Sequence, residues 1–182
     1  MRDDVRRPLV VMSPKSLLRH PKAVSTFADI ADGSFQPVVD DEAFAAGGAD
    51  GVRRIVVASG KLVYELLSAR EKAGRGDVAI VRLEELYPFP GVELGRVLAR
   101  YPQDATLVFA QEEPKNMGAW RFVREHFIEG AVPGAGPERP LRYAGRRFSA
   151  SPAPGSHHIF AMEQEGLVAD ALGVEAEVPA KV

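Results

Sequence analysis

Short, almost continuously apolar runs alternate with longer segments whose apolar residues recur at helical spacing. The runs and the helical segments that follow them are 55–58 and 61–73, 77–83 and 92–101, and 106–110 and 119–128. Strands that are apolar on both faces and separated by helices of ten or more residues form parallel sheets covered by helices on both sides. The alternation therefore predicts an α/β domain of three layers, with a mostly parallel sheet in the middle.

The pattern continues toward the C-terminus. Residues 141–144 are a short strand candidate, and residues 159–172 carry apolar residues at the spacing of a final helix. Between them lie two loops, at 130–140 and 146–158, rich in glycine, proline and serine. We expect the α/β domain to occupy residues 51–173 and to be followed by a tail at 174–182.

The first fifty residues have a different character. The apolar run Leu9 to Met12 ends at Ser13-Pro14 and predicts a buried strand, after which the chain is basic up to Pro21. Residues 32–50 are rich in glycine, alanine and acids and have weak periodicity. We therefore expect residues 21–50 to be a linker, with a domain boundary near residue 50.

Composition narrows the class of protein. The 182 residues carry a formal net charge of -2, which gives no sign of nucleic-acid binding, and they include no cysteine. Disulfides and thiolate metal sites are thereby excluded, and a reducing compartment is favoured. The apolar run after the charged N-terminus is too short for a signal peptide or a membrane span, so we expect a cytoplasmic protein without membrane contact.

Functional groups of open α/β sheets gather in loops beyond the carboxyl ends of the strands. One such loop, Ser59-Gly60-Lys61, offers backbone N–H groups and a lysine to a phosphate. Because it lacks the full phosphate-loop pattern, the interpretation of Ser59 as a helix N-cap is favoured over phosphate binding. Arg146 and Arg147 offer donors for an anion. An exposed structural or interface role is the favoured reading of that pair.

Histidines and paired carboxylates give no catalytic signature by themselves. His157 and His158 are adjacent and point in different directions, with no carboxylate at a matching spacing, so no metal site is expected. The neighbouring carboxylates at 84–85 and 112–113 are expected to face apart. Composition and periodicity alone thus yield an α/β domain with polar loops at one end.

Four longer stretches add a resemblance to a known family. They are PLVVMSPKSLLRH at 8–20, DVAIVRLEELYPFP at 77–90, QEEPKNMGAW at 111–120, and RYAGRR at 142–147 with SASP at 149–152. In this order they closely resemble the C-terminal end of thiamine-diphosphate-dependent 2-oxoglutarate dehydrogenase. That family supplies the decarboxylating first component of the 2-oxoglutarate dehydrogenase complex.

The resemblance implies a particular place for each segment. The family is built like transketolase, so residues 1–20 are expected to be the end of the second, pyrimidine-binding domain, and residues 51–173 the whole transketolase C-terminal-like domain. The family's G-D-G…N-N segment for diphosphate and metal is absent from the sequence. Thiamine diphosphate and Mg²⁺ are therefore expected to bind to the missing domains, and no residue of this chain is expected to be catalytic.

The resemblance also implies partners and a reaction. The whole enzyme would decarboxylate 2-oxoglutarate in the tricarboxylic acid cycle and pass the succinyl group to lipoamide. Its partners would be the missing thiamine-binding domains, a second copy in a homodimer, and the dihydrolipoyl succinyltransferase component. This chain, a fragment, split subunit or free-standing domain, would serve dimer assembly and the rim of the active-site channel without activity of its own. The interdomain candidates are Glu112, Glu113, Asn116 and Trp120.

A second function within the same resemblance is a regulatory module that binds acetyl-CoA or AMP. The basic candidates for such an anionic effector are Lys15, Arg19, Lys61, Arg146 and Arg147. Transketolase, pyruvate dehydrogenase and branched-chain dehydrogenase proteins have a similar third domain. The motifs at 111–120 and 142–147 look specific to the 2-oxoglutarate branch, with Lys115, Met117 and the glycine-rich 130–136 as departures.

Overall fold

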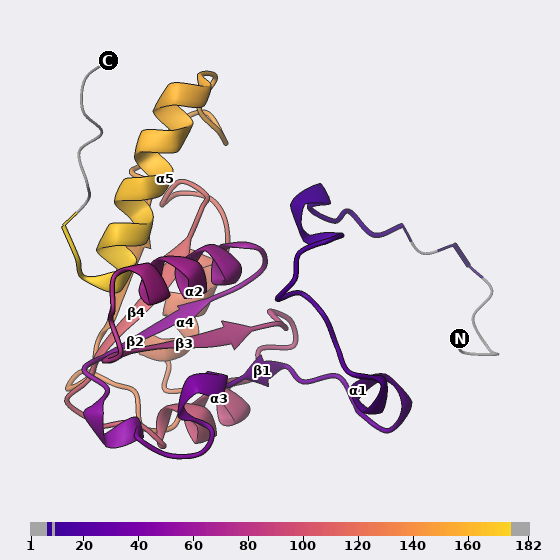
Figure 1. Cartoon of the computed structure of the whole chain (residues 1–182). Helices are drawn as coiled ribbons and strands as arrows, with labels where there is room; N and C mark the ends of the chain where they lie inside the picture. The colour runs from indigo at the N-terminus through magenta and orange to yellow at the C-terminus, as the bar shows by residue number, and fades with distance from the viewer. Residues whose placement is uncertain (1–6, 9, 176–182) are drawn as a thin grey trace. The chain divides into compact units, whose positions relative to one another are not determined.

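The computed structural model describes residues 7–8 and 10–175. The chain divides into two compact units, Met1–Ser34 and Phe35–Val182, which are described separately (Figure 1). The second unit contains the sheet and its covering helices. The unit thus starts earlier than the expected domain boundary near residue 50.

Five strands form the sheet in the order β1-β3-β2-β4-β5. Strands β2 (Arg54–Ala58), β3 (Val78–Leu83), β4 (Thr106–Gln111) and β5 (Leu141–Gly145) are mutually parallel along this order. The edge strand β1 (Val38–Val39) pairs antiparallel with β3. The predicted mostly parallel sheet is confirmed. Strand β2 lies at its centre, since a strand with apolar side chains on both faces suits a position where neighbouring elements cover it completely.

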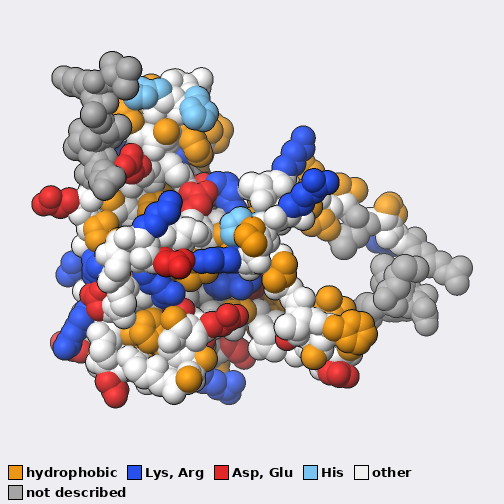
Figure 2. Space-filling model, viewed as in Figure 1, with side chains coloured by type: hydrophobic (Ala, Val, Ile, Leu, Met, Phe, Trp, Pro, Cys, Tyr) orange, Lys and Arg blue, Asp and Glu red, His pale blue; other side chains and the backbone are white. Residues whose placement is uncertain are grey.

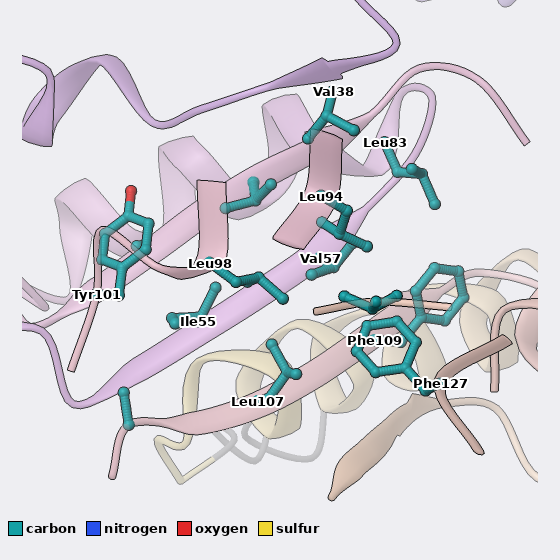
Figure 3. Close-up of a cluster of buried hydrophobic side chains, with 14 of the residues drawn as sticks. Val38, Ile55, Val57, Leu83, Leu94, Leu98, Tyr101, Leu107, Phe109 and Phe127 are labelled. Atoms are coloured by element: carbon teal, nitrogen blue, oxygen red, sulfur yellow. The ribbon is translucent and has the colours of Figure 1, made fainter. Parts of the chain in front are cut away.

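Helices cover both faces of the sheet, so the predicted three layers are also confirmed. The helices are α2 (Leu62–Lys72), α3 (Gly91–Leu98), α4 (Trp120–Ile128) and α5 (His157–Leu172). Ile55 and Val57 of β2 lie in a core with Leu94 and Leu98 of α3, part of which Figure 3 shows. The alternate β2 residues Val56 and Ala58 lie in a second core with α2 and α5. Alternate residues of a strand point to opposite faces, and each face here has its own pair of helices (Figure 1).

The segment between residues 35 and 50 is not the linker that the sequence predicts. It includes β1, the short helix η2 (Glu42–Phe44) and the beginning of η3 (Ala49–Gly51). Phe44 is buried and packs edge to face against Tyr101, with ring centroids 6.1 Å apart. Asp41 is also buried; its carboxylate accepts hydrogen bonds from the Ile80 amide at 2.7 Å and from the Arg70 guanidinium. A few long-range contacts fix this segment, and a weak local periodicity does not reveal them.

Two arginines hold the end of α5. Arg54 of β2 donates to the carbonyl oxygens of Ala171 and Asp170, both at 2.7 Å. Arg75 donates to those of Leu172 at 2.7 Å and Gly173 at 2.9 Å. The last carbonyls of a helix have no partner within it, and cations favour that end, so these arginines attach α5 to the sheet. Val174, in the predicted tail, packs against the core that α2 and α5 form with the sheet. Residues 176–182 of that tail lie outside the described part of the chain.

The first unit contains η1 (Lys15–Leu17) and α1 (Phe27–Ala31). The predicted buried strand from Leu9 to Met12 is wrong for the residues that the structure describes. Val10, Val11 and Met12 form no strand and are exposed, while Leu9 lies outside the described residues (Figure 2 shows the hydrophobic side chains at the surface of this segment). A strand needs a hydrogen-bonded neighbour, and none pairs with these residues in the described part of the chain. The assignment of 1–20 to a preceding domain stays a prediction.

Among the described residues, no helix is long and apolar enough to span a membrane.

Candidate functional site at the carboxyl edge of the sheet

The strand order creates a switch point between β2 and β4. From β2 the chain passes through α2 to β3 on one side, and from β4 it passes through α4 to β5 on the other side. Connections that leave neighbouring strands in opposite directions open a crevice at the carboxyl ends, where ligands of such sheets bind. The segments that meet here are those following Ala58 and Ala110.

Gln111 organises the loop that follows β4. Its amide nitrogen Nε2 donates to the carbonyl oxygens of Met117 at 2.8 Å, Glu113 at 3.1 Å and Pro114 at 3.2 Å. Its Oε1 accepts from the Trp120 backbone N–H at 2.8 Å. The side chain is buried, so it satisfies backbone groups that would otherwise lack partners. Sequence reasoning missed this role; a lone glutamine at the end of an apolar run was the available signal.

Gly118 is required by the same arrangement. Its φ of 65° is in the left-handed region, and a Cβ at this position would lie 2.8 Å from the Gln111 Oε1. The glycine therefore allows the loop to close tightly over the glutamine side chain.

Trp120 starts α4 and belongs to the core. Its side chain stacks on Phe109, with centroids 6.3 Å apart, and lies 5.0 Å from the Tyr143 ring. The sequence analysis gives Trp120 as an interdomain candidate, whereas the structure places its side chain in the hydrophobic core. With 7% of its surface exposed, Trp120 offers little to an interface.

Asn116 ties the loop after β4 to the loop after β5. Its Nδ2 donates to the Ser149 carbonyl at 2.9 Å, and its Oδ1 accepts from the Ser149 N–H at 3.0 Å. The Lys115 N–H donates to the Arg146 carbonyl at 3.1 Å, and the Tyr143 hydroxyl donates to the same oxygen at 2.8 Å. The motifs at 111–120 and 142–152, which the sequence analysis treated separately, are therefore one bonded unit.

Lys61 and Arg146, two of the effector candidates, lie in one charged cluster. The Lys61 ammonium lies 2.5 Å from Glu112 and 3.2 Å from Glu65. Gln164 of α5 donates to both carboxylates and accepts from Arg146 at 3.3 Å. The cluster joins α2, α5 and both loops.

The electrostatics of this cluster are largely satisfied internally. Burial alone lowers the pKa of Lys61, but hydrogen bonds and attraction to Glu112 and Glu65 outweigh burial and raise it. The buried Arg146 guanidinium lies 3.3 Å from Glu163 and 4.8 Å from the centre of the Phe160 ring. These two cations are thus compensated by carboxylates, which weakens them as receptors for an anion.

The other predicted residues are placed differently. Arg147 is exposed, while Lys15 and Arg19 are exposed residues of the first unit. The predicted N-cap at Ser59 is wrong, since the N-cap position of α2 is Lys61 and no side chain caps it. The loop turns at Gly60, whose φ is 66°, and this extra turn carries Ser59 away from the helix end.

A pocket of about 400 Å³ lies at the switch point. Its lining includes residues of the loops after three strands, with β4 and α4 contributing as well; among them are Ser59, Tyr87, Phe109, Gln111, Glu113 and Phe122. Its wall is mostly apolar, and the polar lining residues are two with a hydroxyl, one with an amide and one with a carboxylate. The sequence indicated these loops but not their convergence.

The described residues do not fit a thiamine diphosphate and Mg²⁺ site. No three His, Asp or Glu side chains within residues 7–8 and 10–175 are grouped so as to hold a metal ion. Lys61 and Arg146, two cations at the carboxyl edge, are paired with carboxylates. The hydrogen bonds of Gln111 and Asn116 hold the loops of this site together.

Fold and site together define a doubly wound α/β domain whose carboxyl edge is organised by two interlocked loops. A family described as "2-oxoglutarate dehydrogenase C-terminal" matches residues 24–172. The chain belongs to this family, and the resemblance noted in its motifs is confirmed. The match begins well before residue 51, in agreement with a structural unit that includes β1.

Relatives of this chain are 2-oxoglutarate dehydrogenase E1 components. The chain is 45% identical to that of Azotobacter vinelandii over 170 residues, which cover 93% of this chain and 18% of the relative. It is 44% identical to that of Haemophilus influenzae, covering 92% and 17%, and 41% identical to that of Cupriavidus necator, covering 90% and 16%. The chain thus spans less than a fifth of the length of these relatives.

Proposed function

We propose that this chain acts as the C-terminal domain of a 2-oxoglutarate dehydrogenase E1 component and supports catalysis by assembly, without performing it. The observation that carries the proposal is the match of 93% of the chain to 18% of an E1 component at 45% identity. The proposed reaction of the whole enzyme is the oxidative decarboxylation of 2-oxoglutarate with succinyl transfer to lipoamide in the tricarboxylic acid cycle. The cytoplasm is the proposed location.

The assembly role rests on how the loops are built. Gln111, Asn116 and Trp120 are committed to contacts within the domain, so they fix the shape of the carboxyl edge. Glu113 is exposed on that edge. Of the four interdomain candidates, Glu113 is therefore the one best placed to contact another domain, while Glu112 is held by Lys61.

Thiamine diphosphate and Mg²⁺ are proposed for the rest of the enzyme. A cofactor of this kind performs the carbanion chemistry, and the protein supplies orientation and electrostatics. The residues described here offer it no recognisable site. The proposed partners are the thiamine-binding domains, a second E1 copy and the dihydrolipoyl succinyltransferase component.

An assay of the isolated chain tests the proposal that this chain does not catalyse the reaction by itself. The purified chain is incubated with 2-oxoglutarate, thiamine diphosphate, Mg²⁺ and ferricyanide, beside the intact E1 component of Azotobacter vinelandii as positive control. We expect ferricyanide reduction by the intact protein only. Turnover by the isolated chain, proportional to its concentration and removed with it, would overturn the supporting role.

The alternative function is a regulatory module for acetyl-CoA or AMP. The specific observation in its favour is that Lys61 and Arg146 lie in one cluster at the carboxyl edge, with Arg147 exposed next to Arg146. Against it stand the carboxylates that already compensate both cations. Calorimetric titration of acetyl-CoA and AMP into the wild type and the Arg146→Ala variant distinguishes the assembly role from the regulatory role. We expect no heat of binding at millimolar ligand. Heat that the substitution removes would favour the regulatory module.

A further inference from the structure

The pocket at the switch point has a negative, aromatic character, and its lining includes Glu113, for which a contact with another domain is proposed above. Its lining includes no lysine, arginine or histidine. The carboxylate of the lining residue Glu113 makes no hydrogen bond or ion pair with any residue in the described part of the chain. The adjacent Glu112 differs, since Lys61 and Gln164 both donate to it. An anionic ligand is therefore disfavoured at this pocket, and a cation is favoured.

Aromatic side chains supply the other part of the recognition chemistry. Tyr87 lines the pocket with 84% of its surface exposed, and Phe122 packs edge to face against Phe89, with ring centroids 6.0 Å apart. Aromatic faces attract cations, and a planar guanidinium can stack on a ring while its N–H groups bond to a carboxylate. Arginine suits this combination better than lysine, whose ammonium is compact and strongly hydrated.

The chain uses the same chemistry for two of its own arginines. Arg146 lies over the Phe160 ring at 4.8 Å and pairs with Glu163 at 3.3 Å. A second case is Arg82, which lies over the Tyr64 ring at 5.8 Å and pairs with Glu84 at 2.8 Å. An aromatic ring next to a carboxylate is thus an arginine receptor in this fold. The pocket has both groups without an internal cation.

We propose that the pocket receives an arginine side chain of another polypeptide. A polypeptide fits better than a small cation because the rim residues Leu86 and Tyr87 are apolar and exposed, at 36% and 84%. Covering them requires apolar atoms on both sides of the guanidinium, which neighbouring residues of a peptide supply. Aromatic and arginine side chains are also enriched at the centres of protein interfaces.

The test is a nuclear magnetic resonance titration of the full chain with matched probes. The first probe is an acetylated and amidated Leu-Arg-Leu peptide, the second has citrulline in place of arginine, and the third is agmatine. We expect the arginine peptide to shift the amide resonances of Ser59, Gly118 and Phe122. Citrulline removes the charge at nearly the same shape, so binding falls about fivefold or more. Agmatine lacks the flanking leucines, and we expect a similar loss.

Variants connect the binding to the pocket. Glu113→Gln should lower affinity for the arginine peptide to the level of the citrulline peptide, because it removes the carboxylate and keeps the shape. Glu129→Gln removes an exposed carboxylate that does not line the pocket, and it should change nothing. Equal binding of the citrulline peptide, or no effect of Glu113→Gln, would overturn the proposal. Agmatine binding as tightly as the peptide would overturn the polypeptide as occupant and leave a small-molecule site.

Discussion

At the scale of single residues, the Gln111 side chain joins β4, its loop and the first residue of α4. The Gln111→Leu substitution keeps the approximate volume and leaves a buried N–H and several carbonyls without their partner. Each buried polar group left unpaired costs about 1–3 kcal/mol. We expect the free energy of unfolding, measured by urea denaturation, to fall by about 3 kcal/mol.

Gln103→Leu is the matched control, since Gln103 is an exposed glutamine outside the loop. Exposed substitutions usually change stability by no more than about 0.5 kcal/mol. Equal effects of the two substitutions would mean that the hydrogen bonds of Gln111 do not hold the loop.

Tyr143 makes a second prediction at this scale. Burial is the main cause that raises its pKa to about 12. Since the folded pKa lies above the unfolded value of about 10, the contribution of Tyr143 to stability is complete below pH 10 and is lost as pH rises to about 12. Absorbance titration of the tyrosines should show a late step near pH 12 that Tyr143→Phe removes. An unchanged titration curve in the variant would contradict this assignment.

At the scale of elements, α5 depends on its two arginines. The Arg54→Met substitution keeps an apolar stem and removes the donors to the carbonyls of Ala171 and Asp170. Hydrogen bonds from charged groups contribute about 1.5–3 kcal/mol, so we expect a loss of stability in that range. Hydrogen exchange at the last turn of α5 should also be faster.

Arg53→Met serves as the control, because the Arg53 side chain is 67% exposed and its carboxylate partner Asp104 lies 3.7 Å away at the surface. Its effect should remain below about 0.5 kcal/mol. If exchange of the α5 amides is equally fast in both variants, Arg54 does not hold the helix end.

The elements also show what the sequence can and cannot predict. Strands β2, β3 and β4 were predictable because each contains a run of four apolar residues that are buried on both faces of the sheet. Strand β1 was not, since two residues carry no period and pair with Leu83 and Arg82 far along the chain. The reverse error was the run ending at Met12, which is apolar yet finds no neighbour in the described chain. The local sequence pattern indicates which residues could form a strand, whereas a neighbouring strand elsewhere in the chain decides whether that strand forms.

The candidate site follows the same rule. The loops that carry Lys61, Glu112 and Arg146 were predictable from their position after strands. Their pairing through Gln164 was not, because that contact joins residues about a hundred positions apart, such as Gln164 and Glu65. The pairing changes the interpretation of the cations from ligand donors to compensated structural charges.

At the scale of the whole molecule, Asp41 connects residues 35–50 to the rest of the second unit. The Asp41→Ala substitution removes the partner of Arg70 and of the Ile80 amide. Breaking a buried ion pair by removing one member costs about 3–5 kcal/mol. We expect a loss of that size in urea denaturation, against little change for Asp50→Ala, which is exposed. Equal, small effects would restore the linker interpretation of this segment.

The central claim is that this chain supplies the C-terminal domain of a larger 2-oxoglutarate dehydrogenase. The direct measurement uses a chimera in which this chain replaces the matching region of the Azotobacter vinelandii E1 component. We predict that the chimera reduces ferricyanide with 2-oxoglutarate at a rate within about tenfold of the parent, and that deletion of the region abolishes the reaction. A folded chimera without activity, or full activity after the deletion, would contradict the account.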